Sequence, residues 1–210
     1  MKTVKIGTVF FLIAIFLLPF CTVKSQNKKM LFKSLNPQNK IWAVTHIVQI
    51  KKALHVSEQV LNTMDSLYAE RIFATNTEGG HLDAFRHIYW MYSLSSEIGV
   101  ENARRIGIIY EDYNRYVFDN QYNSSYDKAG RLMDEYNNEV GLYLYSKIGY
   151  KDKSIVLENI KNLIINGYAK IISKDKLLRS LDRNNEIIPD SLWRGKWENE
   201  RCLINSNTGT

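Results

Sequence analysis

Residues 80–99 read GHLDAFRHIYWMYSLSSEIG, a stretch without proline that lies between two glycines. The pattern at about 82–95 favours a helix, and Gly99 is of the residue type that commonly ends one. The wider chain agrees, because no proline occurs between Pro37 and Pro189 and proline breaks the interior of a helix. The sequence therefore predicts an all-α fold, a compact bundle of five to seven helices.

The remaining helices are expected where apolar residues recur at helical spacing. The pattern predicts helices around residues 60–68, 100–117, 132–143 and 154–166, and a shorter one at about 175–181. Gly167 follows the helix at 154–166 and favours its end there. Ser124 or Ser125 is expected to cap the helix around 132–143. Strand signals are sparse, and no internal repeat is present.

The first 25 residues have the composition of a secretory signal peptide. A basic start at residues 1–5 precedes an apolar run at 9–20, and we predict cleavage before Gln26. The protein is therefore expected to be exported, either to the periplasm or out of the cell. An uncleaved membrane anchor is one alternative, for which the apolar run is short. Lipidation at Cys21 is another, which the preceding Phe20 disfavours.

Beyond the signal, the sequence predicts a flexible arm at residues 26–40, one helical domain at 41–198 and a loose tail at 199–210. Removing the signal removes three lysines and no acidic residue, so the net charge falls from +6 to +3. This mild charge, without a dense block of lysine and arginine, does not favour nucleic acid as a partner. No membrane span is expected in the mature chain. Cys202 is then the single cysteine, which argues against an internal disulfide and a cysteine-based metal site.

Two histidines, an aspartate and an arginine lie within seven residues at the start of the predicted helix at 82–95. Asp83 and His87 are four residues apart and share one helical face, with Trp90 on the same side. His81, Asp83 and His87 form a reasonable ligand set for a divalent metal with an open position. Without a metal, Asp83 would orient His87 as a general base, and Arg86 would face an anionic group such as a phosphate. The alternative is a satisfied polar pair in a helical core.

A second polar cluster lies in the helix expected around 132–143. Asp134, Asn137 and Asn138 fall on one helical face. Asparagine is a poor helix former, so two of them in an apolar-periodic stretch need a compensating reason. They either bond a neighbouring loop or contribute to a site. Glu111, on the helix between the two clusters, is either a solvated acid or a further catalytic one.

Four other conspicuous residues are expected to be structural. His46 and His55 are isolated from the remaining histidines. Trp193 and Trp197 are four residues apart after the last proline, and we expect them to form an aromatic clasp that closes the helical body.

The two polar clusters resemble a family of helical bacterial domains that is mainly uncharacterised. The family has an Asp-Ala-Phe-Arg-His-x-x-Trp segment, here at residues 83–90, and a Met-Asp-x-x-Asn-Asn-x-x-Gly segment, here at 133–141. Members occur as small exported proteins and as end domains of large secreted or toxin-like proteins. On the intervening helix the family tends to have a His-Glu pair, where this sequence has Tyr110-Glu111. The resemblance covers roughly residues 76–145 and implies a helical fold and a set of polar positions, without implying a reaction.

Two hypotheses for the function remain open. The first is an exported hydrolase acting on a phosphoester, a lipid head group or a cell-wall substrate, with a possible divalent metal. Its expected catalytic residues are His87, Asp83, Arg86, Glu111 and Asp134, and its expected substrate contacts are Asn137, Asn138 and Trp90. The second is a non-catalytic exported module whose polar residues form a buried structural network and which binds a partner or an envelope component. The hydrolase predicts a solvent-reachable cleft at His87 and a perturbed histidine pKa, whereas the module predicts a sealed network.

Overall fold

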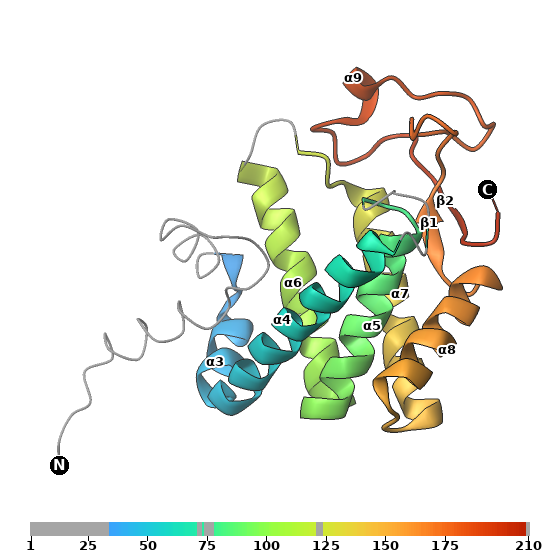
Figure 1. The fold of residues 1–210 in the computed structure, drawn as a ribbon. Coiled ribbons are helices and arrows are strands. Elements are labelled where there is room, and N and C mark those ends of the chain that lie inside the picture. Colours follow the sequence, from blue (N-terminus) through green and yellow to red (C-terminus); the bar gives the residue numbers. More distant parts are fainter. Residues whose placement is uncertain (1–33, 71–72, 74–77, 121–123, 209–210) are drawn as a thin grey trace, which may run out of the picture.

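The computed structural model describes residues 34–208, except 71–72, 74–77 and 121–123 (Figure 1). The predicted signal peptide and residues 26–33 of the predicted arm lie outside the described residues. Within them the fold is all-α, as predicted, with seven helices and one two-stranded sheet. The helices are α3 (Pro37–Thr45), α4 (Ile47–Ala69), α5 (His81–Ile98), α6 (Val100–Asn120), α7 (Lys128–Ile148), α8 (Lys153–Ile165) and α9 (Asp190–Trp193). The strands are β1 (Lys170–Ile172) and β2 (Leu203–Asn205).

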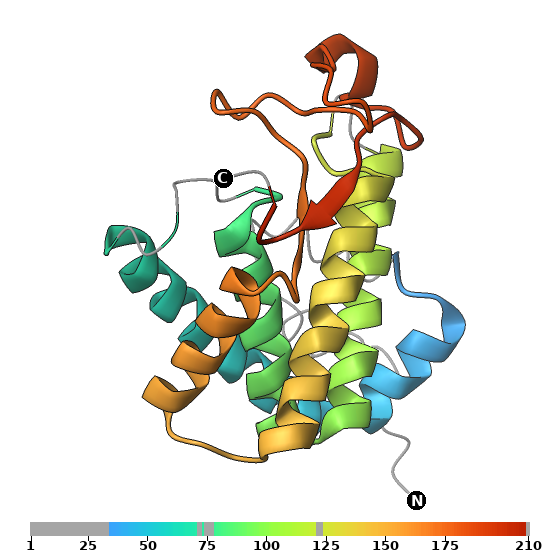
Figure 2. The ribbon, with the colours of Figure 1, turned by 90° about the vertical axis from the view of Figure 1, so that its right-hand side faces the viewer.

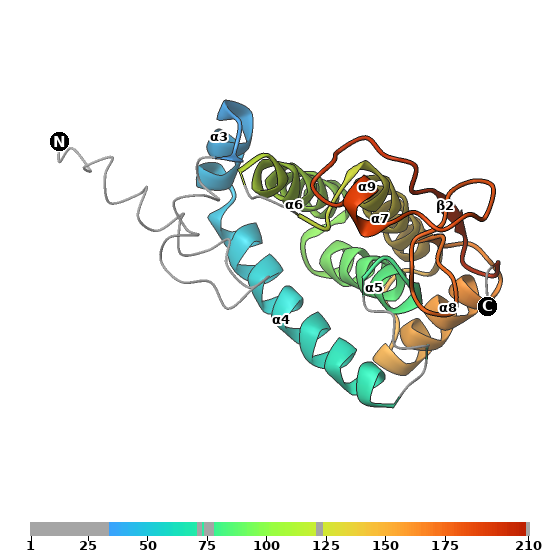
Figure 3. The same ribbon diagram turned by 90° about the horizontal axis from the view of Figure 1, so that it is seen from above.

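Helix α5 is the central element of the bundle. It contacts α4, α6, α7 and α8, and the view from above shows these helices arranged around it (Figure 3). Its apolar side chains point in several directions, and Phe85, Ile88, Met91 and Leu94 are all buried. A helix that is apolar on most of its circumference is stable only inside a protein. Polar residues at the start of α5 are consequently buried with it.

Helices α5 and α7 approach each other closely at Gly141. A Cβ atom at this position would lie 2.8 Å from the Cβ atom of Met91 and would also collide with the backbone carbonyl of Ile88. Only glycine therefore allows the observed spacing between the two helix backbones. This close approach places the polar side chains of α7 against those of α5.

The chain after α8 folds over one end of α5, α6 and α7 (Figure 2). Strands β1 and β2 pair in antiparallel orientation, with Ile171 opposite Ile204. Arg201 makes a buried ion pair with Asp127, at 2.8 Å between Nη1 and Oδ2. The prediction of a loose tail is therefore wrong for residues 199–208. A three-residue strand gives too short an apolar pattern for sequence analysis to detect.

The helix expected at 175–181 is also absent, and this prediction was wrong. Lys174 and Leu181 instead form isolated bridges to Ser180 and Ile187. The carboxylate of Asp175 accepts hydrogen bonds from the backbone N–H groups of residues 177 and 179. An aspartate that bonds its own downstream backbone favours a turn over a helix.

Two helix starts differ from the sequence prediction. Helix α3 begins at Pro37, inside the expected flexible arm, and the side chain of Asn36 caps it by accepting a hydrogen bond from the N–H of Asn39 at 2.8 Å. Helix α7 is capped by Asp127, whose Oδ1 accepts from the N–H of Gly130 at 2.8 Å. The expected caps, Ser124 and Ser125, lie too early in the chain to serve α7.

Of the two C-terminal tryptophans, Trp197 packs on the helical body, whereas Trp193 contacts residues of the C-terminal segment itself. Trp197 lies against Phe118 and Tyr126, and Trp193 is covered by the guanidinium of Arg201, 4.0 Å from its ring centroid. None of the helices within the described residues is long and apolar enough to cross a membrane.

Candidate functional site

The site begins at the N-terminus of α5, where Asp83 is fixed by the backbone. The N–H of Gly79 donates to Oδ2 of Asp83 at 2.8 Å, and the carbonyl of Gly79 accepts from the N–H of Ile172 in β1 at 2.8 Å. Gly79 has a positive φ of 68°, which glycine adopts without strain. The turn before α5 is thus held against β1, and it orients the carboxylate of Asp83.

Arg86 connects Asp83 to His87. Its Nη2 atom lies 2.5 Å from Oδ1 of Asp83 and 2.8 Å from Nε2 of His87. A guanidinium can only donate hydrogen bonds, so Nε2 of His87 must be the acceptor. The proton of the neutral ring is therefore on Nδ1, which donates to Oδ1 of Asn138 on α7 at 2.9 Å.

His87 is fully buried, and its environment keeps the ring neutral. Burial and the nearby charge of Arg86 lower its pKa from 6.5 to about 3, although Asp83 acts in the opposite direction. The ring does not reach solvent, so the structure has no open cleft at His87 itself. A ring with so low a pKa is a weak base at neutral pH, and it fits the general-base role of the sequence hypothesis poorly. A neutral imidazole is the form that binds a metal, and Nε2 would become available to a metal if the guanidinium of Arg86 moved away from it.

Asp134 on α7 completes the group. Its Oδ1 lies 3.2 Å from Nε2 of His87 and is buried without a hydrogen-bond partner. Burial, followed by the charges of Glu111 and Asp83, raises the pKa of Asp134 well above its usual value. Burial also opposes ionisation of Asp83, but the charge of Arg86 and the hydrogen bond from the Gly79 N–H outweigh it and lower the pKa of Asp83. We refer to Asp83, Arg86, His87 and Asp134 as the α5–α7 cluster.

Glu111 reaches the same region from α6. Its Oε2 accepts from the hydroxyl of Tyr126 at 2.6 Å and from the amide of Asn114 at 3.3 Å, while its Oε1 is buried without a partner. Burial raises the pKa of Glu111 to about 7, although these two hydrogen bonds act against the rise. Glu111 and Asp134 are close enough for the charge of Glu111 to raise the pKa of Asp134.

Two residues expected at the site have other positions. His81 directs Nε2 at the carbonyl of Ser206, 2.7 Å away, and stacks on Phe73. Asn137 bonds both backbone groups of Lys170 in β1, at 2.9 and 3.0 Å. These two residues attach the C-terminal segment to the bundle, and neither belongs to the cluster.

Trp90 packs against the ring of His87 and is not a member of the cluster. Its Nε1 donates to Oγ of Ser57 at 2.9 Å, and its ring meets the rings of His87 and Tyr110 edge to face. This geometry fits packing better than substrate contact.

Sequence analysis did not identify Tyr110 and Tyr126 as part of the site. Tyr110 is in van der Waals contact range of Trp90, with ring centroids 5.4 Å apart, and burial raises the pKa of its hydroxyl. Tyr126 donates to Glu111 from the segment that precedes α7. The adjacency of Tyr110 to Glu111 was a weak signal, whereas nothing in the spacing of Tyr126 pointed to this contact.

The residues that could hold a metal are Asp83, His87 and Asp134. One ligand atom from each lies within 4.8 Å of the other two, and Nε2 of His87 is 3.2 Å from Asp134 and 3.8 Å from Asp83. Bonds of about 2.1 Å would place tetrahedral ligands roughly 3.4 Å apart, which is close to these values. The set differs from the sequence prediction, because Asp134 takes the place expected for His81. Arg86 now contacts two of the three ligands, and its side chain, 26% exposed, would turn outward to admit a cation.

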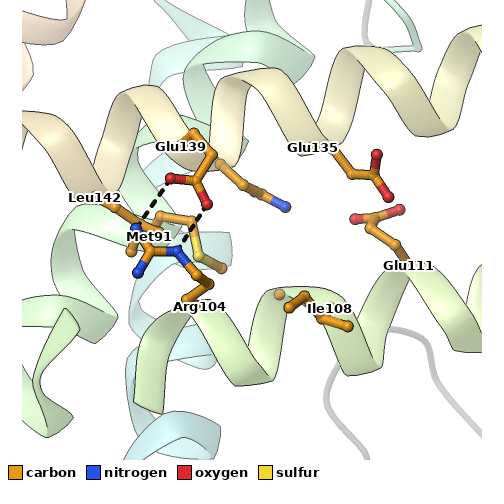
Figure 4. A pocket seen from close by; sticks show the side chains of 9 residues that line it. Met91, Arg104, Ile108, Glu111, Glu135, Glu139 and Leu142 are labelled. Atoms are coloured by element: carbon orange, nitrogen blue, oxygen red, sulfur yellow. Dashed lines mark hydrogen bonds and ion pairs between the residues drawn. The ribbon is translucent and has the colours of Figure 1, made fainter. Parts of the chain in front are cut away.

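A cavity of about 270 Å³ lies beside the cluster, between α6 and α7 (Figure 4). Asn138 and Glu111 belong to its lining. Asn138 bonds His87, and the charge of Glu111 raises the pKa of Asp134. The cavity is therefore next to the cluster, although His87 itself does not line it.

Fold and site together define an all-helical protein with a buried Asp–Arg–His–Asp cluster between two central helices. The chain belongs to a family described as a domain of unknown function, DUF6973, whose model matches residues 40–168, more than half of the chain. The match runs from α3 through α8 and includes the whole cluster. Neither the curated proteins nor the solved structures gave a match to this chain.

Proposed function

We propose that this protein is an exported hydrolase that uses a divalent cation bound by Asp83, His87 and Asp134. The observation that carries the proposal is the buried Oδ1 atom of Asp134, which has no hydrogen-bond partner and lies 3.2 Å from the acceptor nitrogen of His87. Two acceptors at this distance repel each other unless a proton or a cation lies between them. A buried polar atom without a partner is costly, and a bound cation would remove that cost.

The charge balance of the site supports the same proposal. Three buried carboxylates, those of Asp83, Glu111 and Asp134, all interact with the positive charge of Arg86. Buried charges are stable only when they are paired or coordinate a metal. Protons on Glu111 and Asp134 would satisfy this balance in the absence of metal, and a divalent cation would satisfy it with both acids ionised.

Each residue has a role in the proposed reaction. Asn138 fixes the ring of His87, because its Oδ1 accepts from Nδ1 and leaves Nε2 directed at the cluster. Glu111, whose Oε1 is buried without a partner, would contact a positively charged part of the substrate. Arg86, the most exposed cluster side chain, contacts the anionic group of the substrate. A bound divalent cation would lower the pKa of a coordinated water and polarise the scissile group.

A phosphoester is the substrate class that Arg86 fits best. A guanidinium binds phosphate oxygens through paired hydrogen bonds. A lipid head group or a cell-wall component that carries such an ester belongs to the same class.

The second candidate is a non-catalytic module in which the cluster fixes the packing of α5 on α7. It is favoured by the burial of the cluster, because His87 and Glu111 are fully buried and Asp83 and Asp134 are less than a tenth exposed. Two buried oxygens, Oε1 of Glu111 and Oδ1 of Asp134, have no hydrogen-bond partner. This weighs against a purely structural role, because a buried network is stabilising only when every member is paired.

Hydrolysis of bis-p-nitrophenyl phosphate tests the proposal. The purified protein is assayed with zinc, manganese, magnesium or calcium, and with chelator, alongside Asp134→Asn. The matched control is Asp112→Asn, which removes a half-exposed carboxylate on α6 that pairs with Arg131. We expect turnover with one metal, retention of that turnover in Asp112→Asn, and loss of at least about a hundredfold in Asp134→Asn, in line with the removal of a metal ligand. Turnover that is equal in both variants, or no metal-dependent turnover of this or related phosphoesters, would refute it.

A further inference from the structure

The cavity between α6 and α7 has an apolar wall and a polar end. Met91, Ile108 and Leu142 supply apolar surface, and Figure 4 shows these side chains together with the glutamates that border the cavity. The volume of about 270 Å³ is below the usual range for drug-sized ligands, which begins at roughly 300 Å³. The cavity therefore fits a small molecule or one end of a larger one.

Most charges around the cavity are already compensated. Arg104 bonds both carboxylate oxygens of Glu139, at 2.9 and 3.0 Å, across the α6–α7 gap. Glu135 accepts from Arg131 at 2.7 Å. These glutamates need no further cation.

Glu111 is the exception among the charged side chains of this cavity. Its Oε1 is buried and has no partner, and Figure 4 shows its carboxylate pointing from α6 towards that of Glu135 on α7. Two facing carboxylates repel anions and attract a cation or a strong hydrogen-bond donor. The uncompensated acceptor at the end of an apolar wall indicates which chemical class of ligand the cavity fits.

We infer that this cavity binds a small alkylammonium group, with the ammonium on Oε1 of Glu111 and the carbon chain against Met91, Ile108 and Leu142. An ammonium has three donors and a positive charge, which match the free acceptor. A neutral apolar ligand would leave Oε1 of Glu111 desolvated and without a hydrogen-bond partner. A carboxylate ligand would add to the repulsion.

The assignment of the amine to a substrate rests on the proposed hydrolase function. Asn138 lines the cavity and bonds His87, so an amine bound on Glu111 lies next to the proposed cation site. The substrate class is then a phosphoester that carries a primary amine within a few bonds of the ester. Binding of the amine itself does not depend on hydrolysis.

Titration of the whole protein with n-butylammonium, followed by methyl NMR of Ile108 and Leu142, tests the inference. Chelator is present throughout, so the result is independent of any metal-dependent turnover. n-Butanol and butyrate serve as the uncharged and the anionic probe of the same length. We expect n-butylammonium to shift both methyl signals and to bind at least about tenfold more tightly than either control probe.

Two variants and one control locate the ammonium. Glu111→Gln removes the charge and is expected to weaken n-butylammonium binding at least about tenfold. Gly107→Ala narrows the cavity, because the new Cβ would lie 3.3 Å from the flexible Cε of Met91, and is expected to weaken binding severalfold. Glu101→Gln, at an exposed carboxylate that bonds Arg104 from outside, is expected to leave binding unchanged.

Several results would overturn the inference. These are equal affinity for n-butanol or butyrate, unchanged affinity in both Glu111→Gln and Gly107→Ala, and no binding of n-butylammonium to the wild type. Amine binding without metal-dependent hydrolysis would refute the proposed hydrolase and leave the amine site intact. Hydrolysis without amine binding would refute the amine site alone.

Discussion

The imidazole of His87 and the amide of Asn138 hold each other across the α5–α7 interface, with 2.9 Å between Nδ1 and Oδ1. The two residues are 51 positions apart in the chain. This bond fixes the proton of His87 on Nδ1 and directs the lone pair of Nε2 at Arg86 and Asp134. The chemistry available to the α5–α7 cluster depends on that orientation.

The ring of His87 is expected to stay neutral, with its proton on Nδ1, between pH 5 and pH 8. The physical reason is its pKa of about 3, which burial and Arg86 produce. Long-range ¹H–¹⁵N NMR of the ring nitrogens measures both the tautomer and the pKa. His46 and His55, which lie on exposed or half-buried positions, serve as internal references. A midpoint for His87 between pH 5 and pH 8, or a proton on Nε2, would contradict the geometry of the cluster.

The neighbouring residues Asn137 and Asn138 form a matched pair with different expected phenotypes. Asn138→Ala removes the bond that orients His87, and loss of such a partner typically weakens metal affinity by about 10–100-fold. Asn137→Ala removes the bonds to Lys170 in β1, and we expect lower stability with unchanged metal affinity. Calorimetric metal titration and thermal melting of both variants separate the two effects. Equal metal affinity in the two variants would show that Asn138 has no role in orienting the ligand.

Glu111→Gln is expected to raise stability in a pH-dependent manner when metal is absent. The folded protein holds the proton of Glu111 up to a pKa of about 7, whereas the ordinary value is 4.5. The wild type therefore loses stability as the pH rises from about 4.5 to about 7, and the loss is complete above that window. The neutral variant does not lose this contribution, so its advantage grows over the same window, up to about 3 kcal/mol. Urea unfolding at pH 4.5, 6 and 8 with chelator measures this advantage, and an advantage that is the same at all three pH values would refute the assignment.

Gly141→Ala is expected to destabilise the fold and to separate α5 from α7. The added methyl group would collide with Met91 and with the backbone of Ile88, and overpacking of this kind costs about 1–3 kcal/mol or more. Gly130→Ala is the control, because its Cβ would meet only ordinary contacts of 3.4 Å or longer. Denaturant unfolding compares the two variants. A stability of Gly141→Ala equal to that of the control would mean that the helices can move apart without cost.

The main helices could be predicted from the sequence because each is long and has a clear apolar period. The helix expected at 82–95 is observed as α5, His81–Ile98, and its predicted end at Gly99 is confirmed. The elements that were missed are short: β1 and β2 have three residues each. Their positions depend on contacts with distant parts of the chain, such as the pair Arg201–Asp127.

The candidate site could be predicted in outline, but not in its ligand set. Helical spacing correctly placed Asp83 and His87 on one face, and Asp134 with Asn138 on another. It treated Asn137 and Asn138 as members of one face, whereas neighbours on a helix point about 100° apart, and the two asparagines bond different partners. It also assigned His81 to the metal set, whereas the fold of the C-terminal segment brings Ser206 to that ring.

Thermal melting of the wild type and Asp134→Asn, with chelator and then with each of zinc, manganese, magnesium and calcium, measures cation binding at Asp83, His87 and Asp134. A metal present at about 100 times its dissociation constant, and bound only to the folded state, adds roughly 2.7 kcal/mol. We expect one metal to raise the melting midpoint of the wild type by several degrees and the midpoint of Asp134→Asn not to respond. No shift of the wild type with any metal, or an equal shift in Asp134→Asn, would contradict a cation site at Asp83, His87 and Asp134.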